Sequence, residues 1–554
     1  MRRSKGNILF IITVAGLILT AAASISATAF LTLSQCGRET EWHQIRLTAK
    51  SAANQALYRI MVQRHKAGAR GQASLTGDEW EKIIAGSDDK RFRFDESADP
   101  GFSVENGCRA EITFSGEGKY RSIYNFSSEK PVRITGRRLS APPNSVDLVI
   151  RAGGRTQSRT FEAVIEKRWP YCLASGAYAV DIGRGSVING NVYSSGRMIS
   201  KDVSTRTCYV HAGLSDGRYG AFPEINGNLT AYDDRRIRGR HMLDANVENS
   251  LDGAFKIDPG ASFSGKRELT GLRISGYDIS DFSEGFGNGS ARRIDEELLA
   301  SGAMEEISGT ELGGFSKYLP EGNGKVYLLK KPLRLAGVGR GAGGSVPPDS
   351  NSYEIGGSVV SYPEITKGVA ADIECDGCEL AVDGAMLMIS EERNANEATA
   401  GLHGRGLQSI PKLKGTDASI CASGNICISG GMMESSMQRL VLYGNEDIFF
   451  RPCPAPGENK STFKGAIACR KRLTIRQKDS GLNETGRDDV VLIKGAALCG
   501  FCDKTDEKNR QDSYEELGKN RIYVENAEIE YDPDNISPLH RSIGIPSMAI
   551  WREW

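Results

Sequence analysis

The hydrophobic pattern of the first 66 residues predicts one long helix. Residues 1–5 are basic, no charged residue then occurs until Arg38, and residues 8–33 are largely apolar. A bilayer-spanning helix requires about 20 apolar residues, and this run is longer than that. Because the short segment before it carries Lys and Arg, we expect the N-terminus to lie in the cytoplasm. The sequence therefore predicts a membrane helix with the bulk of the chain on the other side.

The helical pattern continues beyond the apolar run. No Pro or Gly interrupts residues 39–66, and apolar residues recur there at three- and four-residue steps, which is the period of an amphipathic helix. These positions are Trp42, Ile45, Ala49, Ala52, Ala56 and Ile60. At about 1.5 Å per residue, residues 7–66 would form one rod of roughly 90 Å. One half of this rod would lie in lipid and the other half in solvent.

Two simpler interpretations of the N-terminus stay open. In the first, Arg2, Arg3 and Lys5 begin a secretory signal peptide with an apolar region at 8–20 and a small-residue cleavage site at 27–29. In the second, the helix is an ordinary single-pass anchor.

Two N-terminal motifs carry a resemblance to a known family. The segment Lys5-Gly6-Asn7-Ile8-Leu9-Phe10, the apolar run after it, and the Ala-rich stretch ending at Leu57 resemble minor pilins of the X type (PilX-like pilus-assembly proteins). The segments 146–196 and 520–532 are similar to the strand, solenoid and closing rung of large members of this family.

The resemblance implies a processing site and an assembly interface. A prepilin peptidase would cut after Gly6 and leave Asn7 as the first mature residue. Ile11 stands where major pilins carry Glu, and several minor pilins and pseudopilins also lack this Glu. The apolar face would bind other pilin-like helices, in the membrane and later in a fibre. Its residues would be Ile8, Phe10, Ile11, Leu17, Leu19, Ala22, Phe30 and Leu33.

We expect three parts along the chain: the leader and helix at 1–66, a small pilin-like α+β section at 67–168, and a Gly/Asn-rich region at 169–554. In the second part, alternating apolar residues predict strands near 102–104, 110–114, 132–135, 146–150 and 160–165. Such a section would cover the solvent-exposed half of the helix.

A weak repeat predicts the fold of the third part. Ile-Asn-Gly-Asn occurs at 188–191 and again at 225–228, and looser β-rich runs follow at 424–428, 440–445, 490–495 and 522–524. Short strands with Gly or Asn at the corners are typical of a parallel β-solenoid. The fold class is therefore mainly β with a long N-terminal helix, and one or two β-sandwiches are the alternative. We also expect one inserted helix, at 291–300.

Composition limits the partners and the compartment. Lys and Arg number 70, as do Asp and Glu, so the balanced charge gives no reason to expect a nucleic-acid partner. Twelve cysteines in a chain that crosses a membrane indicate an oxidising compartment and disulfides. The expected location is the inner membrane with the bulk of the chain periplasmic, and the cell surface or a pilus after assembly.

Eleven of the cysteines are candidates for disulfides. Two C-x-x-C motifs stand at 375–378 and 499–502, and a zinc or redox site is the alternative for each. Cys421 and Cys427, and Cys453 and Cys469, are possible local pairs. The candidates are Cys108, Cys172, Cys208, Cys375, Cys378, Cys421, Cys427, Cys453, Cys469, Cys499 and Cys502. The remaining cysteine, Cys36, is either unpaired or cross-links neighbouring chains.

The sequence shows no motif for catalysis or for a cofactor. The six histidines are scattered, and no Gly-x-Ser-x-Gly elbow occurs. The G-x-G-x-x-G match at 339–344 is followed by two prolines rather than a helix, so it predicts a loop. The acidic runs 233–234 and 488–489 fit solvated loops, and the acidic turn at 531–534 is at most a weak calcium candidate.

These patterns together predict a non-enzymatic, membrane-anchored, minor-pilin-like protein that assembles with other pilin-like subunits and presents a solenoid suited to adhesion. A surface or polysaccharide ligand is a further expected partner. The alternatives are a secreted or anchored β-helix enzyme acting on polysaccharide, and a passive envelope protein.

Overall fold

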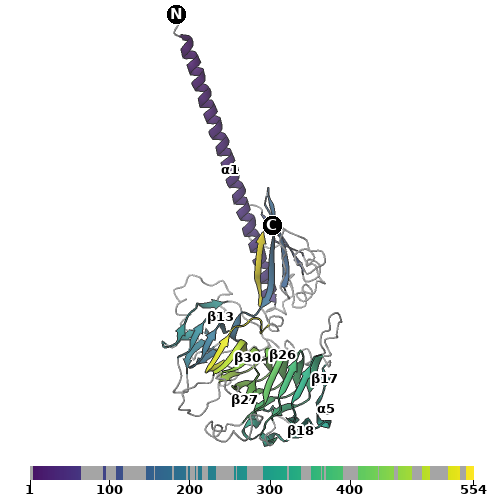
Figure 1. Cartoon of the computed structure of the whole chain (residues 1–554). Helices are drawn as coiled ribbons and strands as arrows, with labels where there is room; N and C mark the ends of the chain where they lie inside the picture. Colours follow the sequence, from purple (N-terminus) through teal and green to yellow (C-terminus); the bar gives the residue numbers. More distant parts are fainter. Residues whose placement is uncertain are drawn as a thin grey trace. The chain divides into compact units, whose positions relative to one another are not determined.

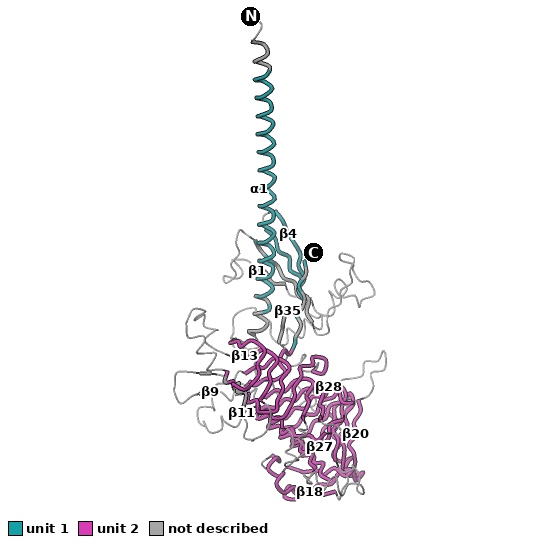
Figure 2. Tube along the Cα trace, turned by 60° about the vertical axis from the view of Figure 1, so that its left-hand side comes forward, with its two compact units in different colours: residues 1–168, 545–554 teal, residues 169–544 magenta. Residues whose placement is uncertain are grey.

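The chain divides into two compact units in a computed structural model. Unit 1 comprises residues 1–168 and 545–554, and unit 2 comprises residues 169–544 (Figure 2). The residues that the structure describes are 4–63, 91–94, 108–115, 145–154, 156–176, 180–194, 198–199, 206–207, 210–214, 222–232, 255–257, 259–270, 291–320, 324–337, 351–363, 365–366, 370–390, 410–434, 436–454, 460–476, 490–499, 522–536 and 545–553.

Unit 1 is one long helix and one antiparallel sheet. The helix α1 runs without interruption over Ser4–Gln63, as the sequence predicts (Figure 1). The sheet has five strands in the order β1-β2-β3-β4-β35, and α1 contacts β2, β3, β4 and β35. The strands are β1 (Arg91–Phe94), β2 (Arg109–Ser115), β3 (Ser145–Gly153), β4 (Ser158–Arg168) and β35 (Ile545–Glu553).

The sheet of unit 1 includes a C-terminal strand from a segment that we expected to belong to the third part of the chain. Strands β2, β3 and β4 cover the runs predicted at 110–114, 146–150 and 160–165, whereas the runs near 102–104 and 132–135 lie outside the described residues. The C-terminal strand β35 pairs antiparallel with β4, with Glu553 opposite Phe161. The last residues therefore return to unit 1 instead of ending the solenoid region.

Unit 2 is a stack of parallel strands in three columns, which agrees with a β-solenoid and not with a β-sandwich. Nearly all of its strands form a 28-stranded sheet, and the pairings are parallel except where β18 (Met304–Ile307) meets β19. A separate two-stranded hairpin consists of β9 (Met198–Ile199) and β10 (Arg206–Thr207).

Each of the three columns follows one side of the winding chain. The first column contains β19 (Val326–Leu329), β22 (Ser358–Ser361), β25 (Met386–Ile389), β27 (Ile426–Met433), β29 (Ile448–Cys453), β31 (Leu473–Arg476), β33 (Ile522–Glu525), β6 (Val180–Gly183), β11 (Val210–Leu214) and β14 (Phe255–Ile257). The second contains β20 (Leu333–Ala336), β23 (Ile373–Asp376), the first half of β26 (Lys412–Ala422), the C-terminal ends of β27 and β29, the first halves of β30 (Lys460–Cys469) and β32 (Val490–Cys499), then β34 (Ala527–Glu530), β7 (Val187–Asn189), β12 (Glu224–Asn226) and β15 (Ser262–Phe263). The third contains β17 (Arg292–Arg293), β21 (Ser352–Ile355), β24 (Glu379–Val382), the second half of β26, β28 (Gln438–Gly444), the second halves of β30 and β32, then β5 (Tyr171–Ser175), β8 (Asn191–Ser194), β13 (Leu229–Tyr232) and β16 (Arg267–Thr270).

The order of rungs in the stack is not the order in the sequence. Strands β5, β6 and β7, which begin unit 2, pair with β32, β33 and β34, which nearly end it. The hydroxyl of Tyr531 also donates a hydrogen bond of 2.5 Å to the carbonyl of Trp169. The first and last rungs therefore meet inside the stack, and β16 and β17 lie at its opposite ends. The segment 520–532, expected to be a closing rung, is a rung but not the terminal one.

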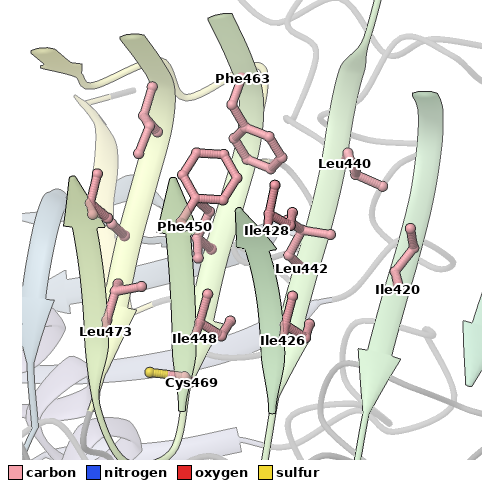
Figure 3. Packing of buried hydrophobic residues seen from close by; sticks show 14 of the residues in the cluster. Ile420, Ile426, Ile428, Leu440, Leu442, Ile448, Phe450, Phe463, Cys469 and Leu473 are labelled. Atoms are coloured by element: carbon pink, nitrogen blue, oxygen red, sulfur yellow. The ribbon is translucent and has the colours of Figure 1, made fainter. Parts of the chain in front are cut away.

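Alternation along each strand fills the interior of unit 2. Ile426 and Ile428 belong to the inner core, whereas Cys427 between them belongs to a cluster on the outside of the first column. Successive rungs place apolar side chains above one another, as Figure 3 shows for Ile426, Ile448 and Leu473. Each buried aliphatic side chain of this kind contributes roughly 1.5–3 kcal/mol, so the stacked interior stabilises unit 2.

Asparagine ladders explain the Ile-Asn-Gly-Asn repeat. The side-chain oxygen of Asn191 accepts a hydrogen bond of 3.1 Å from the backbone N–H of Asn228, and the side-chain oxygen of Asn228 accepts one of 3.0 Å from Lys266. A second ladder joins Asn226 to Asn189 at 3.0 Å. The amides of Asn191 and Asn228 thus satisfy backbone N–H groups of the next rung, whereas Asn226 and Asn189 bond through their side chains.

One end of the stack carries irregular elements. Strand β17 is followed by α5 (Asp295–Ala300), the antiparallel strand β18 and a 3-10 helix, η4 (Gly309–Tyr318). The inserted helix is therefore present, but it begins at Asp295, capped at Ile294 without a side-chain hydrogen bond, rather than at 291. Residues of η4 pack on the outer cluster of the first column.

The close approach of two glycines in the third column provides a test of this stacking. Gly495 has φ +153°, and a Cβ atom added there would lie 1.8 Å from the carbonyl oxygen of Gly465 in the neighbouring rung. We expect Gly495→Ala to lower the free energy of unfolding of unit 2 by about 3 kcal/mol or more, measured by thermal denaturation with circular dichroism. The control Gly314→Ala meets no atom within 4 Å and should leave stability nearly unchanged. Equal stability of the two variants would contradict the described register.

Candidate membrane and assembly helix

The N-terminal half of α1 exposes an apolar surface along its length. Phe30 and Leu33 are each 73% exposed, and the other described positions of the expected assembly face are exposed as well. Those positions are Phe10, Ile11, Leu17, Leu19 and Ala22. Exposed apolar surface of this extent marks a site that meets a membrane or a partner.

The expected processing site lies at the start of the same helix. Gly6, Asn7 and Ile8 belong to α1, but their side chains lie outside the described residues. Among the described residues, one helix, Phe10–Asn54, is long and apolar enough to cross a membrane, and none of its apolar window is buried in the molecule. A signal sequence near an N-terminus has the same length and composition.

A stripe of hydroxyl groups runs along the apolar half of α1. Thr20, Ser24, Thr28 and Thr32 each donate a hydrogen bond of 2.7–2.9 Å to the carbonyl one turn earlier, starting at Gly16. These hydroxyls therefore need no water, which makes them compatible with lipid. Small residues at four-residue spacing also let helices approach closely. The sequence analysis missed this stripe, although the spacing of Gly, Thr and Ser was its signal.

The other half of α1 packs on the sheet of unit 1. Ile45, Ala49, Ala52 and Ala53 are fully buried in one core cluster with side chains from β2, β3 and β4. These small side chains let the helix axis lie close to the strands. The predicted face is confirmed at Ile45, Ala49 and Ala52, whereas the side chains of Ala56 and Ile60 lie outside the described residues.

Polar contacts hold α1 to the edge of the sheet where the exposed half begins. The carboxylate of Glu41 accepts hydrogen bonds from both the backbone N–H, at 2.7 Å, and the hydroxyl of Thr156. The indole N–H of Trp42 donates to Glu553 at 2.8 Å, and the guanidinium of Arg46 lies 5.5 Å from the Trp42 ring centroid. Sequence reasoning could not find these pairs, because Trp42 and Glu553 lie at opposite ends of the chain.

The cysteines occupy several separate places. Cys36 is exposed on α1, Cys108 lies in the core of unit 1, and Cys172 is buried in unit 2, where burial raises the pKa of its thiol to about 12. Cys208 and Cys502 lie outside the described residues.

The cysteines of the expected local pairs 421/427 and 453/469 lie on different strands of unit 2. Cys421 lies on β26 in the third column, opposite Ala381 and Tyr443, whereas Cys427 lies outside the first column in the outer cluster. Cys469 is in register with Cys499, and Cys453 is opposite Met432. In contrast, Cys375 and Cys378 do share a hydrogen bond.

The remaining candidates for chemistry form no site in the described part of the chain. Among the described residues, no group of three or more His, Cys, Asp or Glu side chains is placed to hold a metal ion. The carboxylate of Asp532 accepts hydrogen bonds from Asp534 and Asn535 within its own turn, so it serves the turn. Residues 233–234, 339–344 and 488–489 lie outside the described residues.

Comparisons with known proteins leave the family of this chain open. No family model matches the sequence, and no curated protein matches it. Among solved structures, the chain is similar to the competence-associated pilin ComZ from Thermus thermophilus, at 9% sequence identity, over 92% of this chain and 97% of that chain. The TM-score is 0.23. A TM-score this low does not establish a common fold.

The packing of α1 on its sheet can be tested at Ala52. We expect Ala52→Leu to destabilise unit 1 by about 1–3 kcal/mol, because the added methyl groups would enter a fully packed contact between helix and strands. Limited proteolysis at increasing temperature would measure the change. The matched control is Asn54→Leu on the exposed side of the same turn, which should have little effect. Similar protease sensitivity of both variants would contradict this packing.

Proposed function

We propose that the protein is a membrane-anchored, pilin-like structural subunit of a type IV pilus or pseudopilus system. The observation that carries the proposal is the division of α1 into two halves. The N-terminal half exposes apolar side chains such as Phe30, and the following half buries Ala49 and Ala52 against an antiparallel sheet. A pilin rod needs this arrangement, since one half must contact lipid and other rods while the second half carries the folded part.

The leader supports a specific form of this proposal. The motif at 5–10 resembles the processing site of X-type minor pilins, with cleavage after Gly6 and Asn7 as the first mature residue. Ile11 at the fifth mature position fits a minor rather than a major subunit. The protein would await assembly in the inner membrane with unit 2 in the periplasm, and would reach a fibre or the cell surface afterwards.

The role proposed for unit 2 is a rigid, non-catalytic surface for assembly or adhesion. Its long stack of rungs provides a large, ordered exterior. Several described acidic side chains on that exterior form ion pairs between rungs, for example Glu434 with Lys414 at 2.9 Å and Glu530 with Lys494 at 3.2 Å. Carboxylates engaged in this way favour a structural role over the general acid and base of a polysaccharide-cleaving enzyme.

A charge at the centre of the apolar half tests the proposal. Ala22 is exposed on α1 between Leu19 and Phe30, and a Lys there costs about 2.5–3.5 kcal/mol at the centre of a membrane helix. The remaining apolar run should still insert, so we expect Ala22→Lys to stay in the membrane fraction but to be lost from sheared surface fibres or from pilin-containing complexes.

The control for this experiment is Ala22→Leu, which keeps the apolar surface and should be incorporated like the wild type. Both the membrane fraction and the fibre fraction are measured by immunoblotting of the full chain. Normal incorporation of Ala22→Lys would contradict the proposal that this face contacts other rods.

A further inference from the structure

Two cysteine thiols lie at one corner of the solenoid in unit 2. Cys375 is the third residue of β23, and Cys378 directly precedes β24, so the chain turns between them. Gly377 provides the turn with φ +59°, a left-handed conformation that other residues rarely adopt. Both side chains belong to the inner core, with Cys375 fully buried and Cys378 5% exposed.

The backbone holds this corner from the rungs on both sides. The N–H of Gly377 donates a hydrogen bond of 2.8 Å to Thr416 in the following rung, and the carbonyl of Asp376 accepts one of 2.7 Å from Gly337 in the preceding rung. The carbonyl of Cys378 accepts a third, of 3.2 Å, from Ser419. The backbone of the corner that carries the two cysteines is therefore held by both neighbouring rungs.

The two thiols influence each other's protonation. The thiol of Cys375 donates a hydrogen bond to the sulfur of Cys378, and this bond raises the pKa of Cys375 and lowers the pKa of Cys378. In the neighbouring rungs Cys375 is flanked by Leu335 and Gly415, so the adjacent strands supply no further sulfur to the pair.

We infer that Cys375 and Cys378 form an intramolecular disulfide that closes the Gly377 corner of the solenoid. The zinc alternative for this motif lacks support, because no third metal-ligating side chain joins the two sulfurs within the described residues. Both side chains point into the same inner core on either side of the Gly377 bend, so a single bond across this bend would join them.

The oxidation requires a disulfide-bearing partner, such as a thiol–disulfide oxidoreductase or oxidised glutathione. The thiolate of Cys378 attacks one sulfur of the partner disulfide, and the other sulfur of that disulfide leaves as a thiolate. The thiol of Cys375 then loses its proton and attacks the Cys378 sulfur of this mixed disulfide, which releases the second partner thiolate. Two thiols are oxidised and one partner disulfide is reduced to two thiols. Because both sulfurs are buried, the exchange takes place before the corner closes during folding.

Peptide mapping tests the disulfide directly. Trypsin releases residues 368–393, a peptide whose only cysteines are Cys375 and Cys378. The full chain is refolded in a buffer of reduced and oxidised glutathione, unfolded with N-ethylmaleimide present, and digested. We expect this peptide to be unlabelled and two hydrogen atoms lighter than the dithiol, and to accept two labels after reduction. Two labels without reduction, or a link to another cysteine peptide, would overturn the inference.

Matched variants locate the bond. Cys375→Ser should leave Cys378 able to accept one label or one glutathione without prior reduction. Cys427→Ser removes a buried thiol from the outer cluster and should leave the 368–393 peptide oxidised, as in the wild type. In Cys375→Ser, a Cys378 that is disulfide-bonded to another cysteine peptide of the chain would contradict the assignment.

The same mapping on protein trapped in cells separates this inference from the proposed function, since oxidation in the cell rests on the proposed export of unit 2. An oxidised peptide from cells supports both. A peptide oxidised after refolding but fully labelled from cells would support the pairing and contradict the export.

Discussion

The structure depends on one constraint: a single uninterrupted helix faces two different surroundings along its length. The N-terminal half of α1 exposes large apolar side chains such as Phe10 and Phe30, and no charged residue occurs between Lys5 and Arg38. The C-terminal half of α1 presents small residues, including Ala49 and Ala53, to an antiparallel sheet. Water would solvate the C-terminal half of α1 but not the N-terminal half, so the helix requires lipid or apolar partners along its N-terminal half.

Polar contacts lie at the boundary between the exposed half of α1 and the half that packs on the sheet. Glu41 and Trp42 form hydrogen bonds with Thr156 and Glu553, shortly after the charged residues Arg38 and Glu39. Because Glu553 belongs to the last strand, the C-terminal end of the chain helps to fix the helix on its sheet. The return of the chain to unit 1 through β35 thus links both chain ends to the same unit, whereas the solenoid is an insertion between β4 and β35.

Much of this fold follows from local patterns in the sequence. The helix, the strands at 146–150 and 160–165, and the rungs around the Ile-Asn-Gly-Asn repeat could be predicted, because periodicity and corner residues are local signals. The ladder from Asn191 to Asn228 shows why that motif must repeat: each amide serves the backbone of the next rung. The hydroxyl stripe that begins at Thr20 could also have been predicted from the four-residue spacing of its Ser and Thr residues.

Other features depend on contacts between distant segments and could not be predicted. The pairing of β5 with β32 places the beginning of unit 2 beside its end, and no local signal sets that order. The same is true of β35 with β4. Cysteine pairing shows the same limit, because Cys375 and Cys378 meet through a local turn, whereas Cys421 and Cys427 are close in sequence but lie on different columns.

The mature N-terminus is the most direct test that this helix belongs to a pilin-class subunit. Intact mass and N-terminal peptide sequencing of the native, membrane-extracted protein would determine it. The account predicts a first residue of Asn7, with a methylated amino group as a further sign of prepilin processing. A first residue of Phe30 would contradict it, since the apolar half of α1 would then be a discarded signal peptide, and an intact Met1 would equally contradict it by leaving a plain membrane anchor.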